Sequence, residues 1–247
     1  GPGTILSIRQ TIGTDENGCN NSDEEIVIVN EYEDPVFNQI DQICQGDMFI
    51  LPENSLNGIP GTWSPNPNFL NTSSYTFTAN QGECANSNQM IVEVMSLPVV
   101  SAGVDQEVCI GEFAVLNGSG ATTYQWSDGT ENGISFIPPL GVNSYMVTGT
   151  DINGCSNSDI MQLVVYDLPS VDSGNDEEIC HEEEVTLFAS GIGQVSWSNG
   201  GINGQIVAPN VGTHLYTAYL TDANQCTNTD QVQITVNPNP VIFAGYN

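Results

Sequence analysis

The sequence predicts an all-β chain of tandem sandwich domains, and three observations support this fold class. One strand–turn–strand segment recurs four times: Tyr145–Val165 and Tyr216–Val236 are close copies, while Tyr75–Val94 and Ile8–Val29 are looser ones. Short runs rich in β-branched residues alternate with turn residues about every 8–12 positions, as in a β-sandwich. Glycine and proline interrupt the few stretches with helical periodicity.

The spacing of proline and cysteine divides the chain into repeats. Pro98 and Pro169 stand 71 positions apart, as do Cys109 and Cys180, so no insertion separates these two copies. Short linkers such as Asp167–Pro169 leave little room for swivelling, so we expect an elongated array. The expected parts are the C-terminal half of a truncated repeat (1–34), repeats one, two and three (35–97, 98–168 and 169–239) and the start of the next repeat (240–247).

Aromatic positions indicate that each repeat is an immunoglobulin-like sandwich. Trp126 occupies the place of the buried core tryptophan of that fold, and Tyr145 the place of its tyrosine corner; sugar stacking by the tryptophans is the alternative. The strands expected in repeat two are A at 99–108, B at 113–116, C at 124–127 and E at 134–137, with the recurring hairpin as F and G. The expected structural core residues are Trp63, Trp126, Trp197, Tyr75, Tyr145 and Tyr216.

The charge balance excludes several classes of partner. The chain has 30 acidic residues against a single arginine and no lysine, for a net charge of −29. Such a surface repels phosphate, which argues against nucleic acid and anionic lipid as partners. No apolar run approaches the roughly 18–20 residues of a transmembrane helix, so we expect no direct membrane insertion. We interpret the charge as an adaptation to a salty or extracellular setting, with divalent-cation binding as the alternative.

Seven cysteines without a CxxC pair fit an oxidising, secreted setting and argue against a zinc site. Each full repeat has one cysteine before strand B and one after the F–G turn. In an immunoglobulin-like sandwich these positions lie at opposite ends, roughly 20 Å apart, whereas bonded cysteines need Cα atoms within about 7 Å. We therefore favour bonds between neighbouring repeats, and pairing within each repeat stays the alternative. The favoured bonds are Cys44–Cys155 and Cys109–Cys226, which leaves Cys19, Cys84 and Cys180 for repeats outside this sequence.

The hairpin turns carry oxygen ligands of the kind that calcium binds, and further acids such as Asp159 and Asp230 follow them. The spacing lacks the order of an EF-hand, and ordinary turn chemistry also explains Asp and Asn-Gly at these places. The candidate calcium ligands are Asp15, Asn17, Asp151, Asn153, Asp222 and Asn224.

No motif of a known enzyme class is present. A nucleophile elbow, a phosphate-binding loop and an HExxH sequence are all missing. A sandwich of about 71 residues offers little cleft for the paired carboxylates of a glycosidase. We therefore expect no enzyme activity.

The repeats resemble those of giant surface proteins of flavobacteria. Repeat one carries the resemblance in Ile43–Asp47 (ICQGD), Asn57–Pro65 (NGIPGTWSP) and Gly82–Cys84 (GEC). Repeat two carries CxGExxxL and TDxNGC, and the WSDG and WSNG turns lie in repeats two and three, as in related immunoglobulin-like or PKD-like repeats. Those surface proteins are similar to SprB-like gliding-motility adhesins. The resemblance covers nearly the whole chain and implies export by the type IX secretion system to the bacterial cell surface.

Together these observations predict a non-catalytic stalk segment of a secreted adhesin, acting in gliding motility or surface attachment. The expected partners are neighbouring repeats, surface polysaccharide and the cell-surface motility machinery. The alternatives are a glycan- or calcium-binding repeat module and a spacer of a secreted polysaccharide-degrading enzyme.

Overall fold

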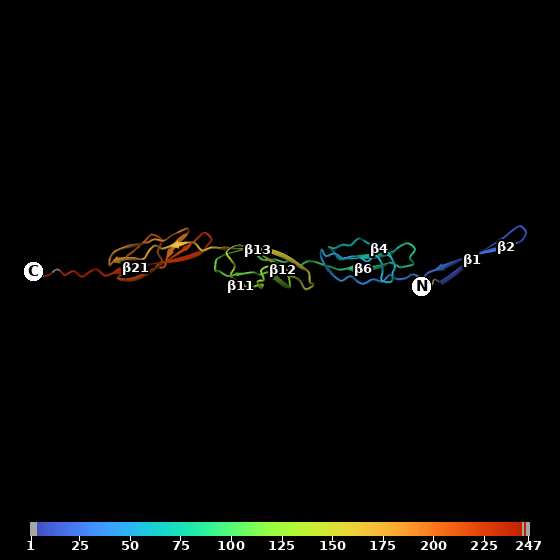
Figure 1. Ribbon diagram of the computed structural model, residues 1–247, viewed down its shortest axis with the longest axis horizontal. Coiled ribbons are helices and arrows are strands. Elements are labelled where there is room, and N and C mark those ends of the chain that lie inside the picture. Colours follow the sequence, from blue (N-terminus) through green and yellow to red (C-terminus); the bar gives the residue numbers. More distant parts are fainter. Residues whose placement is uncertain (1–3, 244, 246–247) are drawn as a thin grey trace. The chain divides into compact units, whose positions relative to one another are not determined.

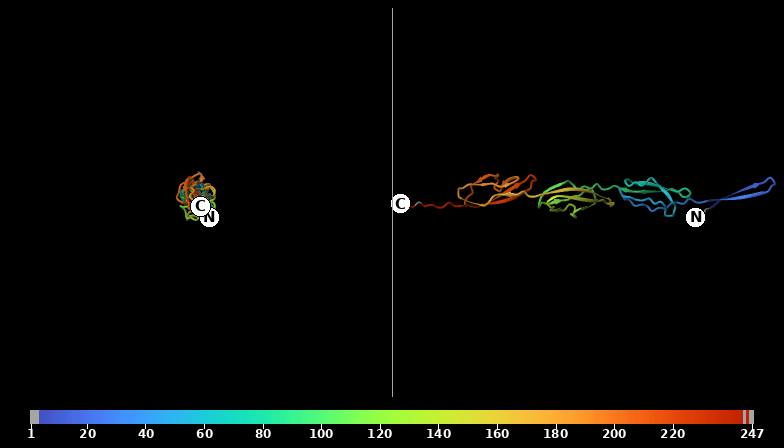
Figure 2. Two further views of the ribbon diagram at one scale, coloured as in Figure 1. Left: turned by 90° about the vertical axis from the view of Figure 1, so that its left-hand side faces the viewer. Right: turned by 45° about the horizontal axis from the view of Figure 1, so that its top comes forward.

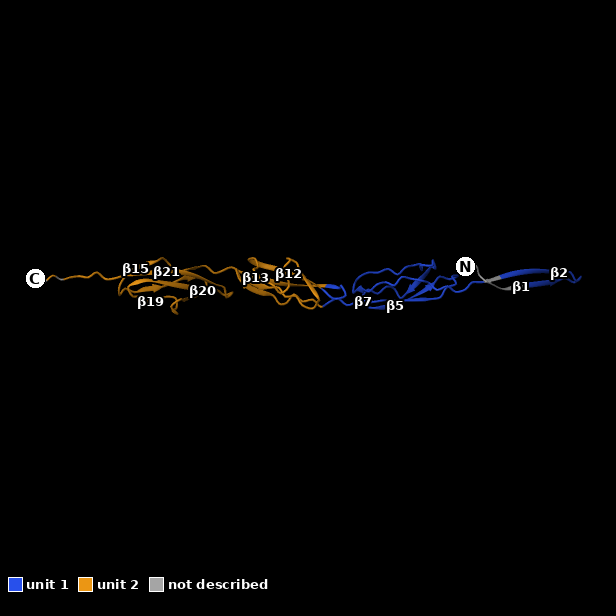
Figure 3. Cartoon of the chain, turned by 90° about the horizontal axis from the view of Figure 1, so that it is seen from below, with its two compact units in different colours: residues 1–98, 150–156 blue, residues 99–149, 157–247 orange. Residues whose placement is uncertain are grey.

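The computed structural model describes residues 4–243 and 245, and every regular element in them is a β-strand. The predicted all-β class is therefore confirmed. The chain divides into two units, Gly1–Pro98 with Thr150–Ser156 and Val99–Gly149 with Asn157–Asn247, which Figure 3 colours separately. None of the described segments forms a helix that could span a membrane.

The first unit begins with a hairpin of two long strands. β1 (Thr4–Thr14) and β2 (Asn20–Val29) pair antiparallel as a narrow two-stranded ribbon (Figures 1 and 2). Their described side chains are exposed, Ile12 and Ile26 included. The turn lies at 15–19, where the sequence predicted it.

Within the first unit, the residues of repeat one pack around a small core of their own. Its strands are β3 (Ile43–Cys44), β4 (Gly61–Ser64), β5 (Ser73–Ala79), β6 (Asn88–Val92) and β7 (Val94–Met95). β4, β5 and β6 form an antiparallel sheet in that order, and β3 pairs in parallel with β7. Leu51, Tyr75, Met90 and Val92 make the buried core, with Trp63 packed half-buried against it.

Repeat two forms two sheets that enclose one core. Its strands are β8 (Gln106–Cys109), β9 (Ala114–Val115), β10 (Thr123–Trp126), β11 (Ser135–Phe136), β12 (Gly141–Thr150) and β13 (Ser156–Tyr166). One sheet has the order β10-β12-β13-β8, with β8 parallel to β13, and the other pairs β9 with β11. This is the strand order of an immunoglobulin-like sandwich, in which strands C, F, G and A′ face strands B and E.

Repeat three has the same arrangement with one further pair. Its strands are β14 (Val171–Asp172), β15 (Glu177–Cys180), β16 (Val185–Leu187), β17 (Ser190–Gly191), β18 (Gln194–Trp197), β19 (Gln205–Val207), β20 (Gly212–Thr221) and β21 (Thr227–Asn237). One sheet has the order β15-β21-β20-β18, and β16 pairs with β19. β14 pairs with β17.

Strands B, C and E of repeat two lie within one residue of their predicted ends, but strand A at 99–108 was wrong as a single strand. Ser101 bridges antiparallel to Ser119, whereas β8 pairs in parallel with β13 in the other sheet. Gly103 lies between the two segments with φ of +88°, a conformation that glycine adopts without strain. The chain therefore changes sheets within the predicted strand.

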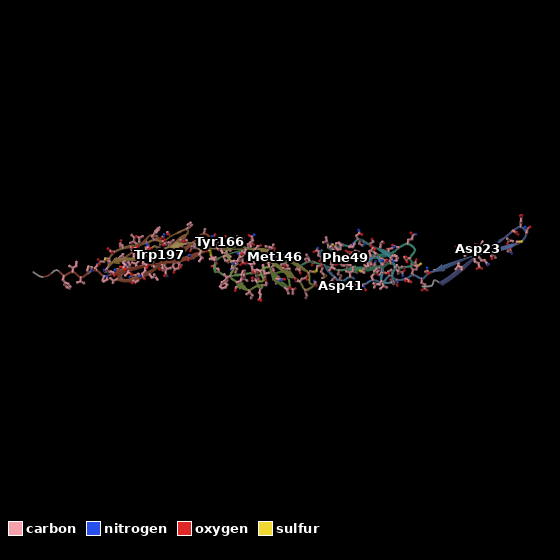
Figure 4. The ribbon with its side chains drawn as sticks, in the orientation of Figure 1. Asp23, Asp41, Phe49, Met146, Tyr166 and Trp197 are labelled. Carbon is pink, nitrogen blue, oxygen red and sulfur yellow. A yellow bond between two sulfur atoms is a disulfide. The ribbon has the colours of Figure 1, made fainter. Side chains whose placement is uncertain are left out.

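Apolar and polar residues alternate along the long hairpin of each sandwich. Because successive side chains of a strand point to opposite faces, the apolar residues line the core. On β20 and β21 the buried set is Ala218, Leu220, Val232, Ile234 and Val236. Figure 4 labels Trp197, which is buried in the same repeat.

Four of the six predicted core aromatics are buried. These are Trp126, Trp197, Tyr75 and Tyr145, whereas Trp63 and Tyr216 are half-buried. The tyrosine-corner expectation needs a correction within repeat two. Tyr124, rather than Tyr145, makes a tyrosine-corner type of bond: its hydroxyl donates to the backbone oxygen of Ala121, three positions earlier, at 2.6 Å. Tyr145 packs edge-to-face against Phe136, and burial raises the pKa of its hydroxyl.

Candidate cross-link sites

The first cysteine of each full repeat ends a short strand that pairs with the last strand of the same repeat. Cys44 lies opposite Met95, Cys109 opposite Tyr166, and Cys180 opposite Asn237, each in a parallel pair. We call Cys44, Cys109 and Cys180 the strand-end cysteines. Because the pairing is repeated, all three occupy the same place in their sandwiches.

An acidic residue three positions later holds the backbone of each strand-end cysteine. The Cys109 nitrogen donates to Oε2 of Glu112 at 2.9 Å, and the Glu112 nitrogen donates back to the Cys109 oxygen at 3.0 Å. Cys180 makes the same two bonds with Glu183, at 2.7 and 3.1 Å. Asp47 plays this part for Cys44. The tight turn thus fixes the direction of the backbone at the cysteine.

The second cysteine of each repeat follows the F–G turn. We call Cys19, Cys84, Cys155 and Cys226 the turn cysteines. In three of the four turns, one aspartate caps the turn: its Oδ1 accepts from the cysteine nitrogen and from the nitrogen two positions after the aspartate, each at 2.9 Å. The capping residues are Asp15 for Cys19, Asp151 for Cys155 and Asp222 for Cys226.

The fourth F–G turn is different. Asn80 stands where the others have aspartate. Its backbone carbonyl oxygen accepts from the Glu83 nitrogen at 3.1 Å, a backbone bond that the other three turns also make. The oxygen of Cys84 accepts from the Glu33 nitrogen at 2.8 Å. The chain that leads into repeat one therefore lies beside Cys84.

Two disulfides join a strand-end cysteine to a turn cysteine of the following repeat. Cys44 bonds Cys155 with Cα atoms 5.4 Å apart, inside the first unit. Cys109 bonds Cys226 with Cα atoms 5.6 Å apart, inside the second unit. These are the two bonds that the strand order favoured over pairing within a repeat. Cys155 and Cys226 are almost fully buried, whereas the unbonded Cys19, Cys84 and Cys180 are exposed.

The candidate calcium ligands act as turn residues. The aspartates Asp15, Asp151 and Asp222 use Oδ1 for the backbone bonds given above, and Asn17, Asn153 and Asn224 contribute the backbone nitrogen at the second position. Among residues 4–243 and 245, no three His, Cys, Asp or Glu side chains are grouped as a metal ion requires. The turn chemistry alone accounts for these residues.

Two further aspartates fasten strand A to strand G. Asp159 Oδ2 accepts from the Ala102 nitrogen at 2.8 Å, and this bond lowers the pKa of the Asp159 carboxyl. Asp230 Oδ2 accepts from both the nitrogen and the hydroxyl of Ser173, at 2.8 and 2.7 Å, and its pKa is likewise lowered. Both pairs span 57 positions of sequence. We call them the A–G clamps.

The sequence analysis did not predict the acid that holds each strand-end cysteine, and it noted Asp159 and Asp230 only as further acids near the turns. The signal for both lies in the 71-position period. Glu112 and Glu183 keep it, as do Asp159 and Asp230. Their partners, however, are backbone groups, which leave no mark in the sequence.

No protein family and no curated protein matches the sequence. Solved structures show weak likeness. A crystal structure of the N-terminal eight Ig domains of Down Syndrome Cell Adhesion Molecule (DSCAM) is 14% identical, with TM-score 0.35, over 93% of this chain and 43% of that one. The titin domains I67–I69 are 17% identical, with TM-score 0.34, over 67% and 75%. Fibronectin(III)-like modules of Clostridium thermocellum CbhA are 12% identical, with TM-score 0.31, over 61% and 100%. The immunoglobulin-like assignment rests on the strand order.

Proposed function

We propose that this chain is a non-catalytic, load-bearing segment of an extracellular adhesive protein. The carrying observation is the pair of disulfides Cys44–Cys155 and Cys109–Cys226, each of which joins consecutive repeats. Disulfides persist in oxidising, extracellular settings, and a net charge of −29 keeps such a surface soluble there. The resemblance to SprB-like adhesins extends the proposal to a bacterial cell surface, type IX secretion and gliding motility.

The disulfides shorten the covalent path through which tension passes. Along the backbone, 182 positions separate residues 44 and 226. With both bonds intact, the shortest path runs from Cys44 to Cys155, back along the 46 positions to Cys109, and across to Cys226. At about 3.5 Å per extended residue, these paths measure about 640 Å and about 160 Å. With both disulfides intact, the stretch between residues 44 and 226 can therefore extend to only about a quarter of the length that it reaches without them.

Single-molecule stretching of the chain between its termini tests this limit. We expect the fully unfolded oxidised chain to be about 480 Å shorter than the chain treated with reductant. Cys226→Ser should give an intermediate length, because the path then follows the 71 positions from Cys155 to residue 226. Equal lengths before and after reduction would remove the load-bearing argument.

The surface location needs its own experiment. Antibodies against this chain should label intact producing cells, and external protease should remove the label. Label that appears only after the cells are lysed would contradict the extracellular proposal. The stretching result would stand in that case, so the two parts of the proposal fail separately.

Glycan binding is a second candidate, favoured by a surface hollow in repeat one. The hollow has a volume of about 380 Å³, and its lining includes Phe49, Trp63 and Glu53. Figure 4 labels Phe49. Aromatic rings beside a polar group suit the apolar face and the hydroxyls of a sugar. Retention of the chain on polysaccharide that Phe49→Ala abolishes would support this candidate, and retention unchanged by that substitution would exclude the hollow.

A further inference from the structure

The exposed cysteines fall into the same two classes as the bonded ones. Cys180 is a strand-end cysteine, and Cys109, at the equivalent position 71 residues earlier, is bonded. Cys19 is a turn cysteine of the same capped form as Cys155 and Cys226, both bonded. Each exposed cysteine therefore has an equivalent in this chain whose partner is known.

We propose that Cys180 and Cys19 are complementary half-sites, and that Cys180 of one copy of this chain forms a disulfide with Cys19 of a second copy. The occupant of the Cys180 site is thus an aspartate-capped turn ending in cysteine. Covalent extension of this kind goes beyond load bearing within one chain, and it can occur whether or not the chain bears load.

The backbone geometry of both half-sites matches that of the bonded sites. The Cys180 nitrogen lies 2.7 Å from Oε2 of Glu183, and the Cys109 nitrogen lies 2.9 Å from Oε2 of Glu112. The nitrogen of Cys19 lies 2.9 Å from Asp15 Oδ1, the distance also found in the turns of Cys155 and Cys226. Neither backbone has to rearrange before the bond forms.

Cys84 provides an internal control for the turn. It is also an exposed turn cysteine, but Asn80 replaces the capping aspartate and Glu33 bonds its carbonyl oxygen. Both turn cysteines that are bonded have the capped form. Because Cys19 has the aspartate-capped turn and Cys84 does not, we expect Cys19 rather than Cys84 to be the partner of Cys180.

The reaction needs a small disulfide such as oxidised glutathione as the oxidant. The Cys19 thiolate attacks one glutathione sulfur, which forms a mixed disulfide and releases one glutathione thiolate. The Cys180 thiolate then attacks the Cys19 sulfur and releases the second thiolate. Two protein thiols are oxidised and one glutathione disulfide is reduced. Glu182 and Glu184 beside Cys180, and Asp15 beside Cys19, are like charges, so the rate should rise with salt.

Two single variants of the full chain isolate the reaction. Cys19→Ser keeps Cys180, and Cys180→Ser keeps Cys19, so neither variant alone can form the proposed bond. In a glutathione redox buffer, an equimolar mixture should give a covalent dimer of one copy of each variant. Peptide mapping with an acid-directed protease should find Cys19–Cys180 in about tenfold excess over Cys84–Cys180, which equals a docking preference of about 1.4 kcal/mol.

The controls keep the proposal falsifiable. Cys84→Ser, combined with each variant, should leave the yield of mixed dimer unchanged. The unsubstituted chain should give a ladder of oligomers, because each copy carries both half-sites. Dimers that form equally well within each single variant, or that link Cys180 to Cys180 or to Cys84 as often as to Cys19, would overturn the proposal.

Discussion

Cys109 and Cys226 are joined by a disulfide although 117 positions of sequence separate them. The bond connects the end of β8 with the F–G turn of the next repeat. A crosslink between such distant positions restricts the unfolded chain, and its typical contribution to stability is about 2–4 kcal/mol. The bond therefore couples the stability of two repeats.

Removal of this bond should destabilise both repeats that it joins. We expect Cys226→Ser to lower the free energy of unfolding by about 2–4 kcal/mol. Each full repeat contains a single tryptophan, so fluorine NMR of fluorotryptophan-labelled chain reports the three repeats separately during urea unfolding. Cys180→Ser is the matched control and should leave the urea midpoints unchanged. A shift confined to Trp197 would show that the bond does not couple the repeats.

Repeat three places side chains at two turn positions that glycine occupies elsewhere. Glu182 has φ of +75°, where Gly46 and Gly111 have +96° and +87°. A residue with a Cβ pays about 1–2 kcal/mol in this conformation. Glu182→Gly should therefore stabilise repeat three by about 0.5–1 kcal/mol, once the larger freedom of unfolded glycine is subtracted. The reverse change, Gly111→Glu, should destabilise repeat two by about 1 kcal/mol, measured by urea unfolding.

The F–G turn offers an independent version of the same test. Gln225 has φ of +67°, and the equivalent Gly154 has +86°. Gln225→Gly should also stabilise repeat three, and its effect should add to that of Glu182→Gly because the two turns are separate. If both substitutions lowered the urea midpoint, strain at these turns would not be the deciding effect.

The A–G clamps predict how stability depends on pH. Hydrogen bonds to Asp159 and Asp230 lower the pKa of each carboxyl below its ordinary value of 3.8. The folded state therefore favours the carboxylates, and the clamps stabilise the fold above that ordinary value. This contribution disappears as the pH falls through the lower pKa of the folded state.

Substitution separates the clamps from the general charge repulsion of the chain. The urea midpoint of Asp159→Asn should lie below that of the unsubstituted chain near neutral pH, and the gap should narrow below about pH 4. Glu107→Gln, on an exposed position of β8, is the control and should leave the pH profile unchanged in shape. A gap that does not depend on pH would mean that the carboxylate charge is not what stabilises the clamp.

The two buried tryptophans of repeats two and three differ in their hydrogen bonds. The Trp126 Nε1 donates to Asn132 Oδ1 at 3.1 Å. Trp197 Nε1 is buried and has no partner among the described residues, although Asn203 bonds to Ala189 as Asn132 bonds to Gly118. A buried polar group without a partner costs about 1–3 kcal/mol. Trp197→Phe should therefore destabilise less than Trp126→Phe, by about 1 kcal/mol in urea unfolding. Equal losses would argue against this difference between the repeats.

The sequence by itself determined strands B, C, E, F and G of repeat two and their order along the chain, because alternation and turn residues act over a few neighbouring positions. Strands B, C and E were predicted to within one residue, and the position of the F–G turn was also predicted. The disulfide choice was within reach too, because strand direction places the cysteines at opposite ends of a sandwich.

Only the tertiary structure decided how distant segments meet. The switch of strand A between sheets at Gly103 and the clamp from Asp159 to Ala102 join groups that local patterns cannot connect. Packing also explains where the 71-position period fails: Gly149 corresponds to Leu220. A Cβ on Gly149 would lie 2.7 Å from Ala121 Cβ. Leu220 fits in repeat three because Gly193 stands where repeat two has Thr122, and a Cβ on Gly193 would lie 2.8 Å from Leu220 Cδ2. Such exchanges depend on partners many residues away, and only the folded chain brings them into contact.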